Sequence, residues 1–311
     1  MSARPPASDP HGAPPPTPGL LTRAPEPAPR SKVTFAELVA KKAAGQPIVM
    51  VTAYDHPTAQ VVDAAGVDVV LVGDSAAMTV LGYESTVPIT IDEMLMLTSA
   101  VRRGLSSALL VADLPFGSYE ASDEQAVATA QRFVKTTGCD AVKIERGGTS
   151  VDRARAIVAA GIAVVGHVGL TPQTAATLGG YRSQGRTADE ALAVCRSALA
   201  LQEAGCFAVV FEAIPSDVTE AVMPLMRVPV IGIGAGPATD GQVLVFHDLL
   251  GIYGGRPARF VKQYAHLRSA MINGVSAYAG DVREGRYPAP EHGYSMAADE
   301  SARLRALLAD L

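Results

Sequence analysis

Four carboxylates stand at the ends of short apolar segments that have the composition of buried strands: Asp74, Asp113, Glu145 and Glu212. If these strands are parallel, their carboxyl ends share one rim, and the four side chains converge there. Carboxylates packed together raise one another's pKa values unless a cation compensates their charge. Because no pair of histidines has ligand spacing, the oxygen ligands favour a hard cation such as Mg²⁺ over zinc.

Two more polar side chains lie on the predicted strands themselves. Lys143 stands two residues before Glu145, so both side chains share one face of the strand. A lysine that faces a barrel interior is costly unless it is paired. Two interpretations follow: Lys143 forms an internal salt bridge with Glu145, or it holds an anionic substrate beside the metal. His167 lies near the end of the next predicted strand.

Three other features point more weakly to chemistry. The glycine-rich run 232–236 is followed by Pro237, so the fingerprint of a dinucleotide-binding loop is not met. Ser75 stands where some serine esterases place a nucleophile, but the sequence singles out no histidine–acid pair to activate it. A nucleophilic Ser75 is therefore the weaker interpretation, and we interpret His247 as a structural histidine near the last predicted strand.

The elements that position these residues alternate along the chain. Short apolar, β-branched runs predict eight strands, over residues 48–52, 67–73, 108–112, 141–145, 162–168, 207–212, 228–233 and 243–247. Helix-like stretches lie between most of them, such as residues 57–65, 91–103, 123–136 and 188–204. This alternation favours a (β/α)₈ barrel over its structural alternative, a doubly wound open sheet. The helix-rich portion from Ala258 onward is predicted to extend the barrel.

The first 30 residues differ in composition from the rest of the chain. They contain ten prolines and little apolar pattern. Such a segment buries too little apolar surface to offset its ordering entropy, so we predict a disordered tail over residues 1–30. Residues 31–311 are then a single catalytic domain, the barrel with its C-terminal helical extension.

Composition excludes several classes of function. The chain has 311 residues, a net charge of −5 and no basic run, so no nucleic-acid partner is expected. The apolar stretch 157–170 is too short and too interrupted by glycine to cross a membrane. The three cysteines have no C-x-x-C spacing, which indicates reduced thiols in a cytoplasmic protein. The N-terminus lacks the pattern of a secretory signal, and its acidic residues and prolines argue against a transit peptide.

Eight longer motifs resemble those of the ketopantoate hydroxymethyltransferases. In chain order they are Val51–Asp55, Leu71–Ser75, Val80–Thr86, Val111–Tyr119, Gly166–Gln173, Leu178–Tyr181, Ile231–Pro237 and Asp240–Val245. The resemblance runs from about Lys32 to about Tyr278, which is nearly the whole chain after the tail. Because many motifs occur in the same order, the resemblance is far more specific than any one of them.

The resemblance implies a (β/α)₈ barrel of the phosphoenolpyruvate mutase/isocitrate lyase-like superfamily. It implies a Mg²⁺-dependent enzyme that transfers a hydroxymethyl group from 5,10-methylenetetrahydrofolate to 3-methyl-2-oxobutanoate, a small branched 2-oxo acid. The product would be ketopantoate, and the reaction a step in pantothenate synthesis. Many members of the family are rings of subunits, often decamers, so a homo-oligomer is expected.

The resemblance also implies roles for residues. Those that match Asp74, Asp113 and Glu145 surround the metal. Those that match Asp74, Ser75, Asp113 and Lys143 hold the oxo acid. Glu212 matches the base that removes the C3 proton. We add His167 to the substrate-binding set, and it is the next candidate for the base. A rim salt bridge from Glu212 to Arg182 or Arg186 is the structural alternative for that glutamate.

Some positions depart from the family pattern, and two rival functions stay open. The departures are Ala76-Ala77, Arg146 and Thr239, which lie beside the site. The nearest rival is a lyase or mutase of the same superfamily, but such enzymes usually need a reactive cysteine near the site. Cys139 precedes the fourth predicted strand and so lies at its opposite end. The other rival, a barrel that binds oxo acids without catalysis, is disfavoured by the four rim carboxylates.

Overall fold

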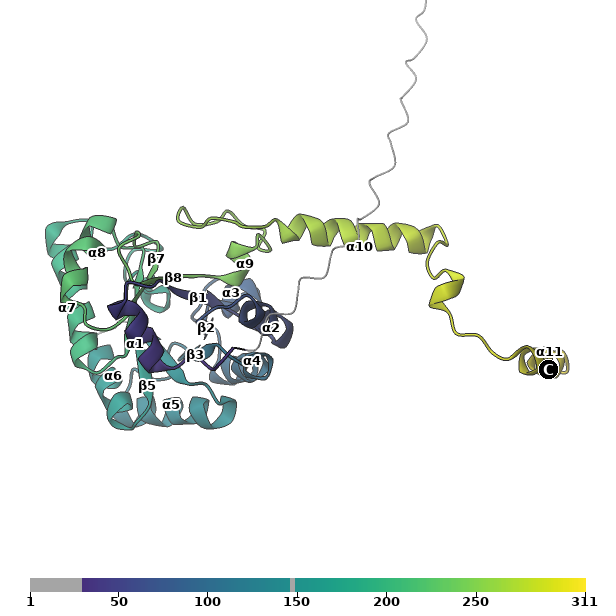
Figure 1. Ribbon diagram of the computed structural model, residues 1–311, viewed down its shortest axis with the longest axis horizontal. Helices are drawn as coiled ribbons and strands as arrows, with labels where there is room; N and C mark the ends of the chain where they lie inside the picture. Colours follow the sequence, from purple (N-terminus) through teal and green to yellow (C-terminus); the bar gives the residue numbers. More distant parts are fainter. Residues whose placement is uncertain (1–29, 146–148) are drawn as a thin grey trace, which may run out of the picture.

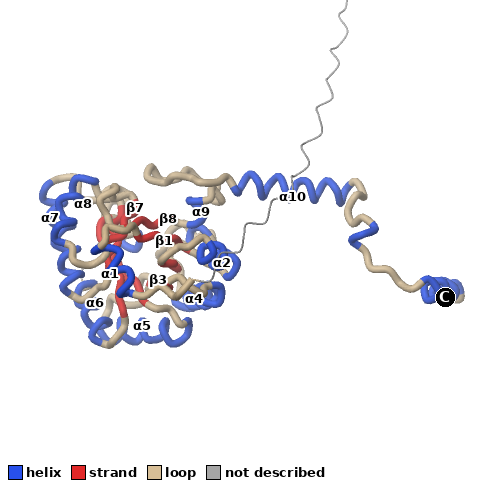
Figure 2. The backbone as a smooth tube through the Cα atoms, in the orientation of Figure 1, coloured by secondary structure: helices blue, strands red, loops and turns tan. Residues whose placement is uncertain are grey.

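Eight parallel strands close into a barrel in the computed structural model, which describes residues 30–145 and 149–311. The strands pair in chain order, and β1 pairs with β8 to complete the ring (Figures 1 and 2). Their bounds are β1 Ile48–Thr52, β2 Val69–Val72, β3 Leu109–Asp113, β4 Ala141–Glu145, β5 Ala163–Gly169, β6 Ala208–Glu212, β7 Val230–Ile233 and β8 Gly241–Leu244. The predicted (β/α)₈ barrel is confirmed, and the doubly wound sheet is excluded because the sheet has closed on itself.

The last strand was predicted two residues too far along the chain. The apolar run 243–247 suggested a strand, but β8 begins at Gly241, and Phe246 and His247 lie in the short helix α9 (Phe246–Leu249). Pairing with β1 decides the difference, because Ile48 stands opposite Gly241 in the register. A Cβ atom at Gly241 would lie 2.3 Å from the Ile48 carbonyl oxygen, so the close approach of the strands requires glycine there.

Helix α1 (Phe35–Ala43) precedes β1, and helices between successive strands cover the outside of the barrel. The latter are α2 His56–Ala64, α3 Ala76–Thr79, α4 Ile91–Gly104, α5 Asp123–Thr137, α6 Ser150–Ala159, α7 Ala188–Glu203 and α8 Ser216–Val222. Helices α2, α4, α5 and α7 match the predicted stretches within one or two residues. Helices α1, α4 and α7 each begin with a capping box, in which a threonine and the glutamate three residues later satisfy each other's backbone N–H groups.

The core has two parts. Inward-facing aliphatic side chains fill the barrel itself, including Met50, Leu71, Val111 and Val210. A larger cluster lies between the outer faces of the strands and the helices. Helix α1 closes the amino end of the barrel, where Leu38 joins the inner cluster and the Phe35 ring contacts Phe207 at 4.6 Å between centroids.

An aspartate stands directly before β2, β4 and β8 and ties the amino end of the barrel together. Asp68 accepts the N–H of Val49 and pairs with Lys41 of α1. Asp140 accepts the N–H of Leu110 and pairs with Lys32. Each aspartate therefore joins its own strand to the preceding one and takes a cation from the N-terminal segment.

The other amino-end carboxylates follow the same principle. Asp240 accepts the N–H of Val230 at 2.8 Å and pairs with Lys42 of α1 at 2.7 Å. Asp63, near the end of α2, accepts the N–H groups of Ser106, Ser107 and Ala108 just before β3. These carboxylates have complete sets of partners.

The C-terminal helices α10 (Leu267–Arg283) and α11 (Ala298–Ala309) extend away from the barrel (Figure 1). Large apolar side chains of α10 are exposed, among them Met271, Ile272, Val275 and Tyr278. Val275 has 68% of its surface exposed, whereas the aliphatic residues inside the barrel are below 8%. No helix in the described parts of the chain has the length and apolar character needed to cross a membrane.

Candidate active site

The carboxyl ends of β2 to β6 bring the predicted site residues into one buried network. Asp113 ends β3 and is the centre of the first half of this network. Its Oδ2 accepts the backbone N–H of Asp74 at 3.0 Å, and its Oδ1 accepts a hydrogen bond from Lys143 Nζ at 2.7 Å. All three residues are less than 5% exposed. Two carboxylates and a buried cation thus share one short stretch of the rim.

Glu145, His167 and Glu212 continue this network across the barrel mouth. Lys143 Nζ lies 3.9 Å from Glu145 Oε1. The His167 imidazole then stands between two carboxylates, with Nδ1 3.3 Å from Glu145 Oε1 and Nε2 3.2 Å from Glu212 Oε2. These are charge contacts rather than aligned hydrogen bonds. Glu212 is the most exposed member, with 16% of its side chain accessible.

Burial and mutual charge set the protonation of this network. Burial raises the pKa of Asp74 well above its usual value, and the neighbouring Glu145 and Asp113 charges raise it further. Burial also raises the pKa of Asp113, against the opposing effect of Lys143. Burial and Lys143 lower the pKa of His167, but its contacts with Glu145 and Glu212 prevail and raise it to about 9. At neutral pH His167 is therefore an imidazolium.

Two further polar residues complete the network, and the sequence analysis gave them no role. Gln173 donates its Nε2 hydrogen to Asp74 Oδ2 at 2.9 Å, and its backbone N–H donates to Glu145 Oε2 at 3.0 Å. Tyr119 donates its hydroxyl to Gln173 Oε1 at 2.6 Å. Both residues stand at the ends of motifs that follow β3 and β5, so their position after a strand was the available signal.

Ser75 lies at the edge of this network. Its hydroxyl is 2.8 Å from the hydroxyl of buried Tyr54. Gly73 lets the turn after β2 approach the site, because a Cβ there would stand 2.9 Å from Ser75 Oγ and 3.5 Å from Asp113 Oδ2. No described histidine contacts Ser75, in keeping with the weaker standing of a nucleophilic serine.

The donor set can be tested against a metal. Nowhere in residues 30–145 and 149–311 do three His, Cys, Asp or Glu side chains form a group that would hold an ion directly. A closed cage of protein ligands is thus a poor description. The raised pKa of Asp74, caused by burial and the nearby Glu145 and Asp113 charges, indicates unmet demand for positive charge. These residues fit Mg²⁺, which uses one or two carboxylates and fills its other positions with water and substrate oxygens.

The structure also bears on the alternatives for single residues. Glu212 contacts His167, and no ion pair joins it to Arg182 or Arg186 in the described parts of the chain. Lys143 pairs more closely with Asp113 than with Glu145, so its salt bridge and its role beside a substrate are compatible. Cys139 is buried two residues before β4, at the end of the barrel opposite the carboxylates.

The residues that depart from the family pattern lie beside the network. Ala76 and Ala77 are fully buried at the start of α3. Thr239 donates its hydroxyl hydrogen to the carbonyl of Gly241 at 2.8 Å, so it supports the start of β8. Arg146 lies outside the residues that the structure describes.

Ala213, the residue after Glu212, has a left-handed backbone with φ 48°. An alanine rarely adopts this conformation, and the residue is held there by two hydrogen bonds. Its N–H donates to the carbonyl of Ile233, and its carbonyl accepts the N–H of Gln184. The turn directs the chain away from the rim at the point where Glu212 faces the mouth.

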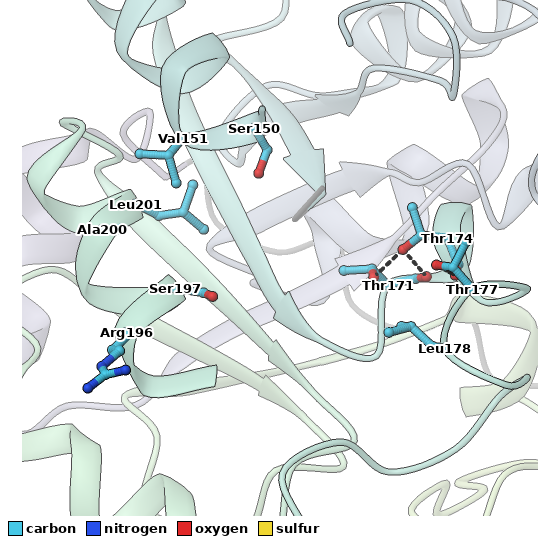
Figure 3. Close-up of a pocket in the computed structure, with 10 residues that line it drawn as sticks. All are labelled: Ser150, Val151, Thr171, Thr174, Thr177, Leu178, Arg196, Ser197, Ala200 and Leu201. Carbon is cyan, nitrogen blue, oxygen red and sulfur yellow. Dashed lines mark hydrogen bonds between the residues drawn. The ribbon is translucent and has the colours of Figure 1, made fainter. Parts of the chain in front are cut away.

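Two cavities adjoin the segment that joins β5 to the short 3₁₀ helix η1 (Pro172–Thr174). One, of about 740 Å³, is lined by Glu212 together with Leu170, Ile214 and Phe260. Another, of about 620 Å³, lies outside the barrel wall between α7 and the turn that carries Thr171 and Thr174 (Figure 3). Only the first has a residue of the charged network in its wall.

Comparison with known proteins identifies relatives over most of the chain. The model of a family described as ketopantoate hydroxymethyltransferase matches residues 32–290. A 3-methyl-2-oxobutanoate hydroxymethyltransferase of Moorella thermoacetica is 52% identical, over 86% of this chain and 99% of its own. The enzyme of that name from Frankia casuarinae is 50% identical, over 93% and 95%. The mitochondrial enzyme 1 of that name from Arabidopsis thaliana is 49% identical, over 88% and 80%.

Solved structures that resemble the chain share its fold at low identity. A phosphonopyruvate hydrolase in complex with oxalate and Mg²⁺ has a TM-score of 0.54 and 15% identity, over 89% of this chain and 98% of that one. A 2,3-dimethylmalate lyase, described as a member of the PEP mutase/isocitrate lyase superfamily, has a TM-score of 0.52 and 17% identity, over 88% and 98%. These likenesses concern the architecture of the barrel.

Proposed function

The chain belongs to the ketopantoate hydroxymethyltransferase family, and from this premise we propose that it forms ketopantoate from 3-methyl-2-oxobutanoate, with 5,10-methylenetetrahydrofolate as the one-carbon donor and Mg²⁺ as the metal. One observation supports the proposal most: the continuous buried network from Asp74 through Lys143 and His167 to Glu212. This network offers a buried cation for an anionic oxo acid and, on the same rim, a carboxylate that can act as a base.

Each part of the network has a task in this reaction. Asp74 and Asp113 would hold Mg²⁺, with Glu145 reaching it through water. When bound, the metal supplies Lewis acidity to the oxo and carboxylate oxygens of the acceptor. Lys143 offsets the acceptor's negative charge, and Ser75 stands at the edge of the same pocket. The acceptor thus lies with its C3 hydrogen toward the side of the mouth that carries Glu212.

Glu212 then removes the C3 proton. Contacts with Glu145 and Glu212 raise the pKa of His167 and favour its protonated form, so Glu212 is the better candidate for the base. His167 holds the Glu212 carboxylate in place through the 3.2 Å contact. The electrons of the C–H bond form an enolate of the oxo acid. The enolate carbon forms the new C–C bond to the methylene carbon of the folate, whose bonds to nitrogen break. Overall, one water molecule supplies the oxygen of the new hydroxyl group, and tetrahydrofolate leaves.

The decisive experiment follows the proton alone. The holoenzyme is incubated with 3-methyl-2-oxobutanoate in deuterated Mg²⁺ buffer without folate, and loss of the C3 proton is measured by NMR. The Glu212→Gln variant should exchange about 10²-fold more slowly, because it keeps the shape but loses the basic oxygen. Glu203→Gln, an exposed glutamate on α7, is the matched control. Exchange at the parental rate in Glu212→Gln would show that another group takes the proton.

The complete reaction separates this function from its rivals. Turnover of 3-methyl-2-oxobutanoate to ketopantoate should require both Mg²⁺ and the folate. A lyase or mutase would turn over an oxo acid without folate, and a binding barrel would not turn it over at all. The position of Cys139 at the opposite end of the barrel gives the lyase alternative no support.

We also propose that the enzyme is a homo-oligomer. The exposed apolar residues of α10 support this, because a single chain leaves Met271, Ile272, Val275 and Tyr278 in water. A second copy of the chain is the partner that these residues fit. The expected form is a ring of subunits, up to the decamers of the family that the sequence resembles. Val275→Asp should lower the mass measured by light scattering, whereas Val61→Asp, at another exposed valine on α2, should not. An unchanged mass in Val275→Asp would remove α10 from the interface.

A cytoplasmic location is the remaining part of the proposal. The three cysteines are free, and two of them are buried, which suits a reducing compartment. The plant relative named above is mitochondrial by its name, which makes that compartment the alternative. Fractionation of cells that express the full chain distinguishes the two.

A further inference from the structure

The cavity beside Glu212 has one apolar wall and one cationic wall. Leu170, Ile214 and Phe260 provide the apolar surface. Phe260 can lie against the end of β7 because Gly234 has no side chain, since a Cβ there would stand 2.5 Å from the Phe260 ring. The cationic side is formed by Arg182 and Arg259. A flat aromatic ligand that also carries negative charge fits this combination.

A second cavity adjoins the first. It has a volume of about 370 Å³ and shares Arg182 and Ser183 with the cavity beside Glu212. Arg186 and Thr187 also line this second cavity. The two cavities together form a path that begins at the proposed base and ends at two arginines.

The loop that carries these arginines is fixed to the active site. The N–H of Gln184 donates to the carbonyl of Ala213, at 3.0 Å. Ala213 follows Glu212 directly and has the left-handed backbone described above. Because this bond lies between Arg182 and Arg186 in the chain, a ligand held by both arginines is held at a defined distance from the base.

The arginines of this path have no protein anion to pair with. In the described parts of the chain, no ion pair or side-chain hydrogen bond involves the guanidinium groups of Arg182, Arg186 or Arg259. Glu190 also lines the second cavity, but its carboxylate accepts the backbone N–H groups of Arg186 and Thr187 as the cap of α7. The only other carboxylate in the path is Glu212, which faces His167. The arginines of the path therefore lack an anionic partner, which a negatively charged ligand can supply.

Resting on the proposed function, we infer that this path binds the folate donor, with the ring system in the cavity beside Glu212 and the glutamate carboxylates on Arg182 and Arg186. This orientation brings the one-carbon unit to the enolate and leaves the charged tail at the surface. A longer polyglutamate tail would continue outward past Arg186 without entering the barrel.

A pair of ligands and a pair of variants test the inference. Binding of tetrahydrofolate and of the primary amide of tetrahydropteroate, which lacks the glutamate and carries no carboxylate, is measured by calorimetry with the holoenzyme and the oxo acid present. Arg182→Gln and Arg186→Gln should each weaken tetrahydrofolate by about tenfold, the effect of one charge-assisted contact. Neither should change the affinity for the amide. Arg196→Gln, an exposed arginine in the separate cavity of Figure 3, should change neither ligand.

Two results would overturn the assignment of the tail. The first is equal weakening of both ligands, which would mean that the arginines act on the fold or on the rings. The second is loss of the glutamate effect in Arg259→Gln but not in Arg186→Gln, which would place the glutamate tail on Arg259 instead of Arg186.

Proton exchange without folate keeps this test separate from the proposed function. If the parent exchanges normally but Arg182→Gln binds both folates as the parent does, the folate path is wrong and the proposed base chemistry stands. The opposite result is also possible: the parent shows no proton exchange, and Arg182→Gln loses the glutamate-dependent part of folate binding. The folate path then stands, and the proposed base chemistry is wrong.

Discussion

The two ends of the barrel both carry carboxylates, but their partners differ. At the amino end, Asp63, Asp68, Asp140 and Asp240 each accept backbone N–H groups, and the last three also pair with a lysine. At the carboxyl end, Lys143 pairs with Asp113 and lies 3.9 Å from Glu145, while burial and the charges of Glu145 and Asp113 raise the pKa of Asp74. The amino-end carboxylates are satisfied by their own partners and join neighbouring strands. The carboxyl-end group gathers negative charge around Lys143, which is the arrangement expected of the proposed metal and substrate site.

Removing one carboxylate from each end should give the largest contrast. Asp113→Asn should lower kcat/KM by about thirtyfold or more, equivalent to about 2 kcal/mol of transition-state stabilisation, and should change the Mg²⁺ dependence of turnover. Asp240→Asn, the same change at the amino end, should lower the melting temperature and leave kcat/KM near the parental value. Asp113→Asn with unchanged Mg²⁺ dependence would remove Asp113 from the metal site.

The next contrast is one of stability and pH. Asp63→Asn should lower the free energy of unfolding by about 2 kcal/mol, because three backbone N–H groups and a serine hydroxyl lose a charged acceptor. Burial acts to raise the pKa of Asp63, but its hydrogen bonds to Ser106, Ser107 and Ala108 prevail and lower it. The contribution of Asp63 to the free energy of unfolding is therefore complete above about pH 4, and it is lost as the pH falls through the lowered pKa. Urea unfolding of both proteins from pH 7 to pH 3 measures this, and a constant difference across that range would contradict it.

The smallest effect is expected at the junction with the N-terminal tail. Deletion of residues 1–29 should leave turnover and stability unchanged. Arg30 lies within the described structure, and its guanidinium donates to the carbonyls of Asp63, Gly66 and Val67 at the end of α2. Arg30→Ala should therefore cost about 1 kcal/mol, measured by thermal unfolding. A large loss of activity on deleting residues 1–29 would show that the tail has a function.

The barrel could be predicted from the sequence because β-branched runs and helical stretches alternate. This signal is local and can be recognised without knowing which residues contact one another. The sequence predicted Asp74, Asp113, Glu145 and Glu212 because strand ends are readable from that pattern. It placed β8 too late, since the Gly241–Ile48 register depends on a strand 193 residues earlier. It gave Gln173 and Tyr119 no role, because their hydrogen bonds join three different loops and no spacing reveals them. The opposite characters of Asp74 and Asp68 are also invisible in sequence, since both simply flank β2.

The bond from Lys42 in α1 to Asp240 before β8 has a consequence for the synthesis of the chain. These residues are 198 positions apart, and β1 pairs with β8 across the same interval. The helix that closes the amino end is made first, but its last partner leaves the ribosome only after seven strands have formed. Contacts of such long separation are slow to form, and until then β1 and β7 each have an open edge that can pair with another chain. A nascent chain halted before Gly241 should therefore depend on chaperones more than one released a few residues later.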